Sequence, residues 1–457
     1  MPTRVLVPSG VLGLGFDRHA LRNGIASAPD IIAIDGGSTD SGPYYLGAGV
    51  SKYSRAATLN EWKMLLQARR EACVPLVLTT AGTCGTDATV DWMLEITRDA
   101  AAELGQTVRV AAVKSSQRRE FIAEAFAGGR IDPLPHAPEI SQTDILGCSN
   151  IVALAGVEQI CAGIRSGADI VIAGRATDTS GIAALPIMNG NHPGAAWHGA
   201  KIAECGALCS THPLSGVISV NFDENGFEVE PMADDARCTA DSVSAHMLYE
   251  NADPFILSEP GGKLDVSRAD YQPVSKRRVR VSGSEWIASD RYTVKLEGAA
   301  PVGYQTTIIA ILRDARYAAR AAEWVQLLKD FLHRQIRDQA SYPPEAYGIE
   351  FRLIGVNAAL GALERRKGNP AEVGVLCIVS AECQAAANEI ARFINPFLLH
   401  FPLTEGEELP TFAFPYSPAE TERGPVYEFR LNHTLEISDP MECFALETHD
   451  YCHAVRR

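Results

Sequence analysis

The chain has 457 residues and a formal net charge of −15 at pH 7. Because the chain is acidic and has no long basic cluster, we expect neither nucleic acid nor an anionic membrane surface as a partner. It also has no apolar run of ~18 residues, so we expect no membrane-spanning helix. Eleven cysteines in no framework spacing indicate reduced thiols, so we expect a cytoplasmic protein with an ordinary buried core.

Residues 1–190 alternate short apolar runs with helical patterns. We expect strands within residues 4–8, 31–34, 75–78, 108–113 and 170–173, with helices between them. Short strands that are apolar throughout are typical of a parallel sheet covered by helices on both faces. The sequence therefore predicts an α/β protein that begins with a doubly wound, mostly parallel, Rossmann-like domain carrying the ligand loops.

The remainder of the chain has a different texture. Residues 191–300 are rich in turn residues and alternating segments, which indicates a mixed, strand-rich region. In residues 301–457 a strand precedes a helix with Trp324 and Leu328 on its apolar face, and further strand and helix patterns follow. We expect a small α+β layer there, ending in an extended, proline-rich tail.

Polar, glycine-rich segments follow four of the expected strands, at 35–42, 79–87, 114–117 and 174–181. Carboxyl ends of parallel strands meet at one sheet edge, where glycines allow close approach and helix N-termini favour anions. We therefore expect a cleft for a small anionic substrate, with Lys114 and Arg175 as counter-charges. The substrate-binding candidates are Gly36, Ser38, Thr39, Thr80, Gly82, Lys114, Arg175 and Thr179. For any single loop, ordinary turn and cap chemistry explains the same residue types.

Acid/base candidates come from the same loops and from residues 198–212, which are rich in His, Glu and Cys. That segment could move protons, but its spacing matches no structural zinc pattern, so we assign no metal ligand; a purely structural role is the alternative. Cys84 precedes an expected helix, where a thiolate is stabilised. The catalytic candidates are Asp35, Asp178, His198, Glu204 and Cys84.

The glycines at 10, 13 and 15 do not follow the G-x-G-x-x-G order of a dinucleotide site, so we expect no nicotinamide. Residues 34–39 resemble the phosphate loop of actin-like sugar and acetate kinases, but the second loop of that fold is missing. The cofactor is left unassigned, with a divalent metal still open.

Several separate motifs resemble the acyclic terpene utilisation proteins of the AtuA type. They are Gly167–Asp178, His198–Gly206, Met247–Pro254, Arg278–Gly283, Tyr292–Lys295, Phe412–Pro418, Gly424–Phe429 and Asn432–His433. The resemblance implies a role in the catabolism of branched acids and acyclic terpenes, in pathways that pass through acyl-CoA thioesters. The chain departs from the usual family pattern at 35–42, 209–215 and 258–263, which are cleft candidates, so the substrate is not carried over.

Together, the cleft and the resemblance predict a catabolic enzyme acting on a small branched carboxylic acid or its CoA ester. We expect hydration, dehydration or isomerisation through an enolate-like intermediate, the work of a lyase (hydratase) or an isomerase, because the cleft offers a base and anion-stabilising donors. The alternatives are a non-catalytic binding subunit of a multi-protein enzyme and a nucleotide-dependent, kinase- or ligase-like enzyme. The extended tail favours a homo-oligomer.

Overall fold

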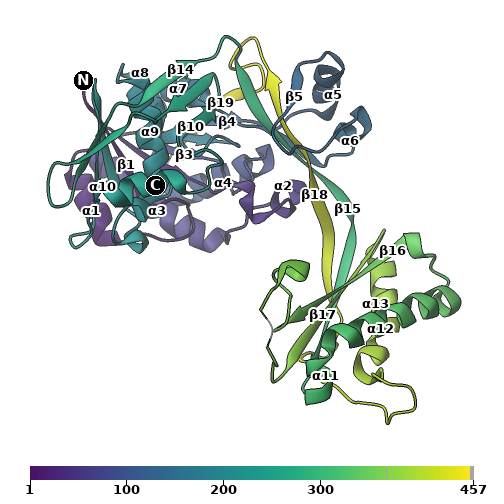
Figure 1. Cartoon of the computed structure of the whole chain (residues 1–457). Helices are drawn as coiled ribbons and strands as arrows, with labels where there is room; N and C mark the ends of the chain where they lie inside the picture. Colours follow the sequence, from purple (N-terminus) through teal and green to yellow (C-terminus); the bar gives the residue numbers. More distant parts are fainter. Residues whose placement is uncertain (367, 453–457) are drawn as a thin grey trace. The chain divides into compact units, whose positions relative to one another are not determined.

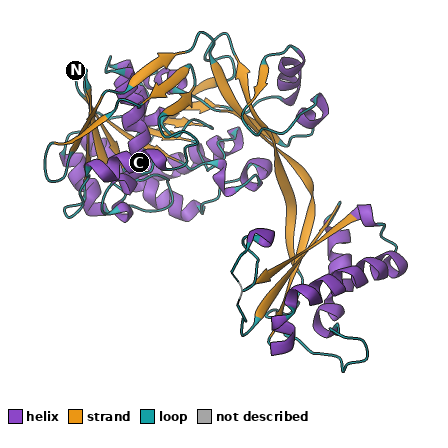
Figure 2. Cartoon of the chain, viewed as in Figure 1, coloured by secondary structure: helices purple, strands orange, loops and turns teal. Residues whose placement is uncertain are grey.

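The computed structural model describes residues 1–366 and 368–452, and the chain divides into two compact units (Figure 1). Unit 1 comprises Met1–Ala300 and Phe429–Arg457, and unit 2 comprises Pro301–Glu428. The mixture of helices and strands confirms the predicted α/β class (Figure 2). Residues 191–300, expected as a separate region, lie within unit 1, as does the end of the expected tail.

A ten-stranded mixed sheet runs through the described part of unit 1. Its strands, in order across the sheet, are β12 (Asp270–Pro273), β13 (Val279–Ser282), β9 (Gly226–Pro231), β8 (Ile218–Phe222), β1 (Thr3–Val7), β2 (Ile31–Asp35), β3 (Leu76–Thr79), β7 (Ile170–Ala173), β4 (Val108–Lys114) and β19 (Ala445–Tyr451). Neighbours from β1 to β4 are parallel, whereas β8 and β19 flank them in antiparallel pairing. The carboxyl ends of the parallel strands therefore share one edge.

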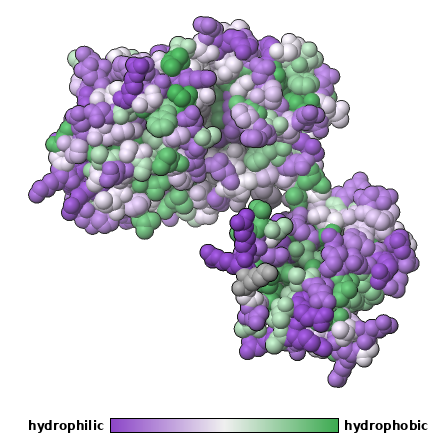
Figure 3. Space-filling view, viewed as in Figure 1, coloured by the Kyte–Doolittle hydropathy of each residue, from purple (hydrophilic) through white to green (hydrophobic). Residues whose placement is uncertain are grey.

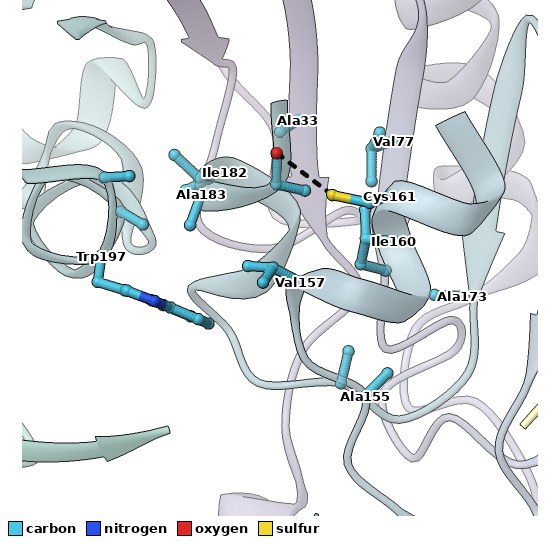
Figure 4. Close-up of a cluster of buried hydrophobic side chains, with 14 of the residues drawn as sticks. Ala33, Val77, Ala155, Val157, Ile160, Cys161, Ala173, Ile182, Ala183 and Trp197 are labelled. Carbon is cyan, nitrogen blue, oxygen red and sulfur yellow. Dashed lines mark hydrogen bonds between the residues drawn. The ribbon is translucent and has the colours of Figure 1, made fainter. Parts of the chain in front are cut away.

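Helices cover both faces of this sheet, because alternate strand residues point to opposite sides. Ile32 and Leu78 belong to one core, with α1 (Arg18–Ala26), α3 (Arg55–Ala72) and α4 (Asp87–Leu104). Ala33 and Val77 belong to the other core, with α7 (Val157–Arg165), α8 (Ser180–Met188) and α9 (Pro193–Ala203). Figure 4 shows part of this second core, where the Cys161 thiol lies 3.4 Å from the carbonyl oxygen of Ala184. This is the doubly wound arrangement that the strand patterns predicted.

Helix α4 shows how local sequence sets an element's limits. Thr86 is its N-cap residue, and Asp87 lies in the first turn, where a negative charge is favourable. Gly105 ends the helix in the left-handed conformation, with φ 60°, that glycine adopts at little cost. The other α-helices in the described part of unit 1 are α2 (Tyr44–Ala48), α5 (Arg119–Ala127), α6 (Gln142–Leu146) and α10 (Ala240–Ala245).

Two long strands, β15 (Thr293–Leu312) and β18 (Thr421–Glu436), have residues in both units. Within unit 1, β15 pairs with β6 (Asn150–Ala153), and β18 pairs with β5 (Ile131–Pro133). Unit 1 also holds a small sheet of β10 (Ile256–Glu259), β11 (Gly262–Asp265) and β14 (Glu285–Ala288). The expected extended tail thus contains β18 and β19.

Unit 2 follows the order β15, α11 (Ala315–Ala319), α12 (Ala321–Gln335), β16 (Tyr347–Ile354), β17 (Val373–Ala381), α13 (Gln384–His400) and β18. Its sheet has the strand order β16-β17-β15-β18, which is that of a ferredoxin-like β-α-β-β-α-β unit. Trp324 and Leu328 of α12 are buried, as their spacing predicted, and belong to the same core as residues of α13.

On the face of the molecule that Figure 3 shows, hydrophilic and hydrophobic residues intermix. None of the helices in the described residues has the length and apolar character needed to span a membrane.

Candidate active site

A cavity of about 490 Å³ adjoins the carboxyl edge of the parallel strands in unit 1. The loop after β7, residues 175–179, forms one side of it, and Lys201 and Glu204 at the end of α9 form another. Residues 250–260, the first residues of β15, and Leu134, Leu154 and Thr434 form the rest of the wall. The cavity has the size of a small-molecule site, since such sites are ~300–1,000 Å³.

Arg175 is buried in the floor of this cavity and holds a network of charged groups. Its Nε donates to Glu297 Oε2 over 3.0 Å, and its Nη1 donates to Asp178 Oδ1 over 3.3 Å. Glu297 also accepts from Lys295 Nζ at 2.9 Å and from Thr39 Oγ1 at 3.0 Å. Burial alone would raise the pKa of Glu297, but the charges of Arg175 and Lys295 outweigh it and lower that pKa to about 2. Glu297 is therefore a fixed carboxylate, and it accepts from both Nε and Nη2 of the guanidinium.

Asp35 and Asp178 form a second group of carboxyls near Arg175. Asp35, at the end of β2, accepts from Thr79 Oγ1 at 2.7 Å and from the Gly37 N–H at 2.9 Å. Burial raises the pKa of Asp35 to about 8, and the negative charge of Asp178 adds to this shift. Asp178 lines the cavity, whereas Asp35 does not.

Glu259, the last residue of β10, lines the cavity, and the two oxygens of its carboxyl group differ in their hydrogen bonding. Its Oε1 accepts from Thr179 Oγ1 over 2.6 Å, whereas its Oε2 is shielded from solvent and has no hydrogen-bond partner. Burial raises the pKa of Glu259 to about 7, although the hydroxyls of Thr177 and Thr179 oppose the shift. A carboxyl group that titrates near neutral pH can both accept and release a proton.

The last turn of α9 brings Lys201 and Glu204 into contact at the cavity wall. The Lys201 ammonium donates to Glu204 Oε1, and both side chains are buried. Burial raises the pKa of Glu204 to about 8 even though Lys201 acts in the opposite direction. Of the sequence-predicted catalytic candidates, Asp178 and Glu204 are the two that line the cavity.

His198 and Cys84 lie elsewhere. The Nδ1 and Nε2 atoms of His198 lie 2.8 Å from Ser284 Oγ and 3.1 Å from Tyr271 Oη, and burial lowers its pKa to about 3. These contacts use both ring nitrogens, so His198 is not paired with Glu204. The Cys84 thiol is buried, 3.7 Å from Thr86 Oγ1.

The expected substrate-binding residues also divide. Arg175 and Thr179 line the cavity. Thr39 and Thr80 contact residues of the charged network, since Thr39 donates to Glu297 and Thr80 accepts from Arg175. Lys114 does not line the cavity. Its ammonium group pairs instead with Asp91 at 3.0 Å and with Glu447 at 3.6 Å.

The glycine-rich loops pack against one another at the sheet edge. A Cβ atom on Gly36 would lie 2.3 Å from the carbonyl oxygen of Thr80, and Gly82 has φ 64°. The Ser38 hydroxyl donates to Asp40 within its own loop at 2.6 Å. These residues therefore shape the loops and do not face the cavity.

Sequence reasoning missed Glu259 and Glu297. Glu259 lies in the segment 258–263, which differs from the usual family pattern, and that departure was the available signal. Glu297 lies between apolar residues of β15 and carries no motif of its own.

The fold and the cavity define an α/β protein with a small-molecule site at the carboxyl edge of its parallel strands, lined by carboxyls of raised pKa. The chain matches the family described as "Acyclic terpene utilisation family protein AtuA" over residues 53–211 and 223–415, and it belongs to that family. The resemblance noted in the sequence is thereby confirmed, and the family suggests a role in acyclic terpene catabolism. Neither the curated proteins nor the solved structures gave a match.

Proposed function

We propose that unit 1 moves a proton at the carbon next to the carboxyl group of a small branched carboxylic acid or its CoA ester. The reaction would be a hydration, a dehydration or an isomerisation through an enolate-like intermediate. The observation that carries the proposal is Glu259, whose Oε2 has no hydrogen-bond partner at the wall of the cavity and whose pKa is raised to about 7.

Glu259 has the properties of a general base at neutral pH. Thr179 holds one carboxyl oxygen, which fixes the orientation of the group, and the other oxygen carries no competing hydrogen bond. When Oε2 takes the proton from Cα, the electron pair of the broken C–H bond moves onto the carboxyl oxygen and forms an enolate. The protonated Glu259 then gives its proton to a β-hydroxyl, which leaves as water while the enolate becomes a Cα–Cβ double bond, or it returns the proton at another carbon of the substrate.

Cationic side chains in the same wall support the binding and stabilisation of this enolate. Lys201 and Lys295 both line the cavity, and the Lys295 side chain is partly exposed. Ammonium groups in a shielded site stabilise developing negative charge more strongly than they do in water. Arg175, engaged by Glu297 and Asp178, holds the carboxylates of the floor in position.

Exchange of the Cα proton in D₂O tests the proposal. The purified protein is incubated with 2- and 3-hydroxy acids, their enoyl forms and the corresponding CoA esters, and deuterium at Cα is followed by NMR. We expect exchange with at least one compound, and a ~10²–10⁴-fold loss of its rate in Glu259→Gln. The matched control is Glu285→Gln, since the Glu285 side chain is 58% exposed and outside the cavity.

Two results would contradict the proposal. The first is no exchange with any acid or ester, with or without a divalent metal ion. The second is exchange by Glu259→Gln at the rate of the unmodified protein.

A further inference from the structure

Three side chains with metal-binding atoms converge next to the cavity. Glu204 and Cys205 follow one another at the end of α9, and His246 begins the short 3₁₀ helix His246–Leu248 after α10. One carboxylate oxygen, the thiol sulfur and one ring nitrogen all lie within 4.8 Å of one another. In the part of the chain that the structure describes, no other grouping of three His, Cys, Asp or Glu residues meets this distance.

His246 supplies an independent sign of a ligand site there. The residue is 4% exposed, and its Nε2 is buried without a hydrogen-bond partner. A backbone hydrogen bond to Lys201 also acts on the imidazole ring. A histidine that binds a metal ion characteristically donates one ring N–H to a carbonyl and directs the lone pair of the other nitrogen at the ion. An ion would satisfy an acceptor that is otherwise costly to bury.

The charges around the three side chains favour a cation. Asp178 and Glu259 act on Glu204, and Asp178 and Glu250 act on Cys205, all through negative charge. Lys201 is the counter-charge in contact with Glu204, and it occupies Oε1, which leaves the second carboxylate oxygen for an ion. The local excess of carboxyl groups therefore offsets the repulsion between a bound ion and Lys201.

We propose that Glu204, Cys205 and His246 bind a divalent transition-metal ion of the Zn²⁺ type at the edge of the cavity. One nitrogen, one sulfur and one oxygen ligand suit Zn²⁺ or Co²⁺ and do not suit Mg²⁺ or Ca²⁺, which take oxygen ligands. As the sulfur–metal bond forms, the Cys205 thiol releases its proton to solvent. Three protein ligands leave a fourth position open, and because Glu204 lines the cavity, the ion adjoins the space where a substrate would bind. This inference does not rest on the proposed function.

Titration of the full-length protein with Co²⁺ after chelator treatment tests the site, because a cobalt–thiolate bond gives a near-ultraviolet charge-transfer band. We expect one Co²⁺ per chain, displaced by Zn²⁺ and unaffected by Mg²⁺. Cys205→Ser should abolish the band, and His246→Gln should weaken binding by at least ~10–100-fold. The matched controls are Cys73→Ser and His212→Gln, whose side chains are exposed and are not part of the cluster.

The proposal is overturned if the unmodified protein gives no band, if the band persists in Cys205→Ser, or if Mg²⁺ displaces Co²⁺ equally well. Should His246→Gln fail to fold, as judged by circular dichroism, Cys205→Ser decides alone, because Cys205 is only partly buried and serine is nearly isosteric. Metal binding is measured without substrate, so its outcome is separate from that of the Cα exchange experiment.

Discussion

The two sides of the cavity differ in how completely their polar groups are bonded. On the side of the strand ends, Arg175, Glu297 and Lys295 form a closed network with one another. On the side formed by Lys201, Glu204 and residues 250–260, Glu259 keeps a buried oxygen without a partner, and a ring nitrogen of His246 next to Glu204 also has none. Buried polar atoms are nearly always bonded, so the strand ends provide a rigid support and the opposite side holds the groups available to a ligand.

Breaking the support should have the largest effect on stability. Glu297→Gln keeps the shape of the side chain but leaves the buried Arg175 without its main counter-charge. We expect the free energy of unfolding to fall by about 3–5 kcal/mol, measured by urea denaturation. Glu285→Gln, at an exposed position, should change it by less than ~0.5 kcal/mol. Equal values for the two variants would show that the network does not support the fold.

The close approach of two strand-end loops should be the next most sensitive feature. Gly85 has φ 63°, and a Cβ atom there would lie 2.1 Å from the backbone nitrogen of Arg175. We expect Gly85→Ala to lower the free energy of unfolding by about 2–4 kcal/mol, from the clash and the left-handed conformation together. Gly129→Ala is the control, since Gly129 has φ 71° and open space around it, and it should cost only ~1–2 kcal/mol. Equal losses of unfolding free energy in the two variants would show that the contact between the two loops adds nothing to the cost of the left-handed conformation.

His198 should give a smaller effect that depends on pH. Burial lowers its pKa in the folded state to about 3 from an ordinary 6.5, so between these values the unfolded chain binds a proton that the folded chain does not. Its contribution to stability is therefore lost as pH falls below about 6.5. His198→Gln should reduce the slope of unfolding free energy against pH by up to ~1.4 kcal/mol per unit in this window. His212→Gln is the control at an exposed histidine. The same slope in the unmodified protein, in His198→Gln and in His212→Gln would contradict the assignment.

Lys114 should matter least. Its ammonium pairs with Asp91 and Glu447 and does not line the cavity, so Lys114→Gln should cost no more than ~1 kcal/mol of stability. The rate of Cα exchange should be unchanged. A large loss of exchange with intact stability would bring Lys114 into the site, as its position after a strand first suggested.

Much of the fold was predictable because its signals are local. The apolar runs at residues 31–34 and 170–173 correctly predicted β2 and β7. Because ligands bind at the carboxyl ends of parallel strands, the loop after β7 was expected to supply site residues, and Arg175 and Asp178 lie there. In β15, by contrast, Pro301 and Gly303 interrupt the pattern, so a single strand of 20 residues reads as two segments.

The rest of the site depends on pairings between distant parts of the chain. Glu297 reaches Arg175 because β15 pairs with β6, and Glu259 reaches Thr179 across 80 residues. Neither pairing leaves a sequence spacing that could be recognised. His198 and Glu204 are catalytic candidates from the same segment of the sequence, but the two side chains bond to different partners in the structure.

The pH dependence of Cα exchange tests the central claim most directly, namely that Glu259 is the proton acceptor of this cavity. Its carboxyl must be ionised to act as a base, and its pKa is raised to about 7. For the unmodified protein, kcat/KM for exchange should rise about tenfold per pH unit below that pKa and level off above it. A profile that is flat from acid to neutral pH, or one with the same rising limb in Glu259→Gln, would contradict the account.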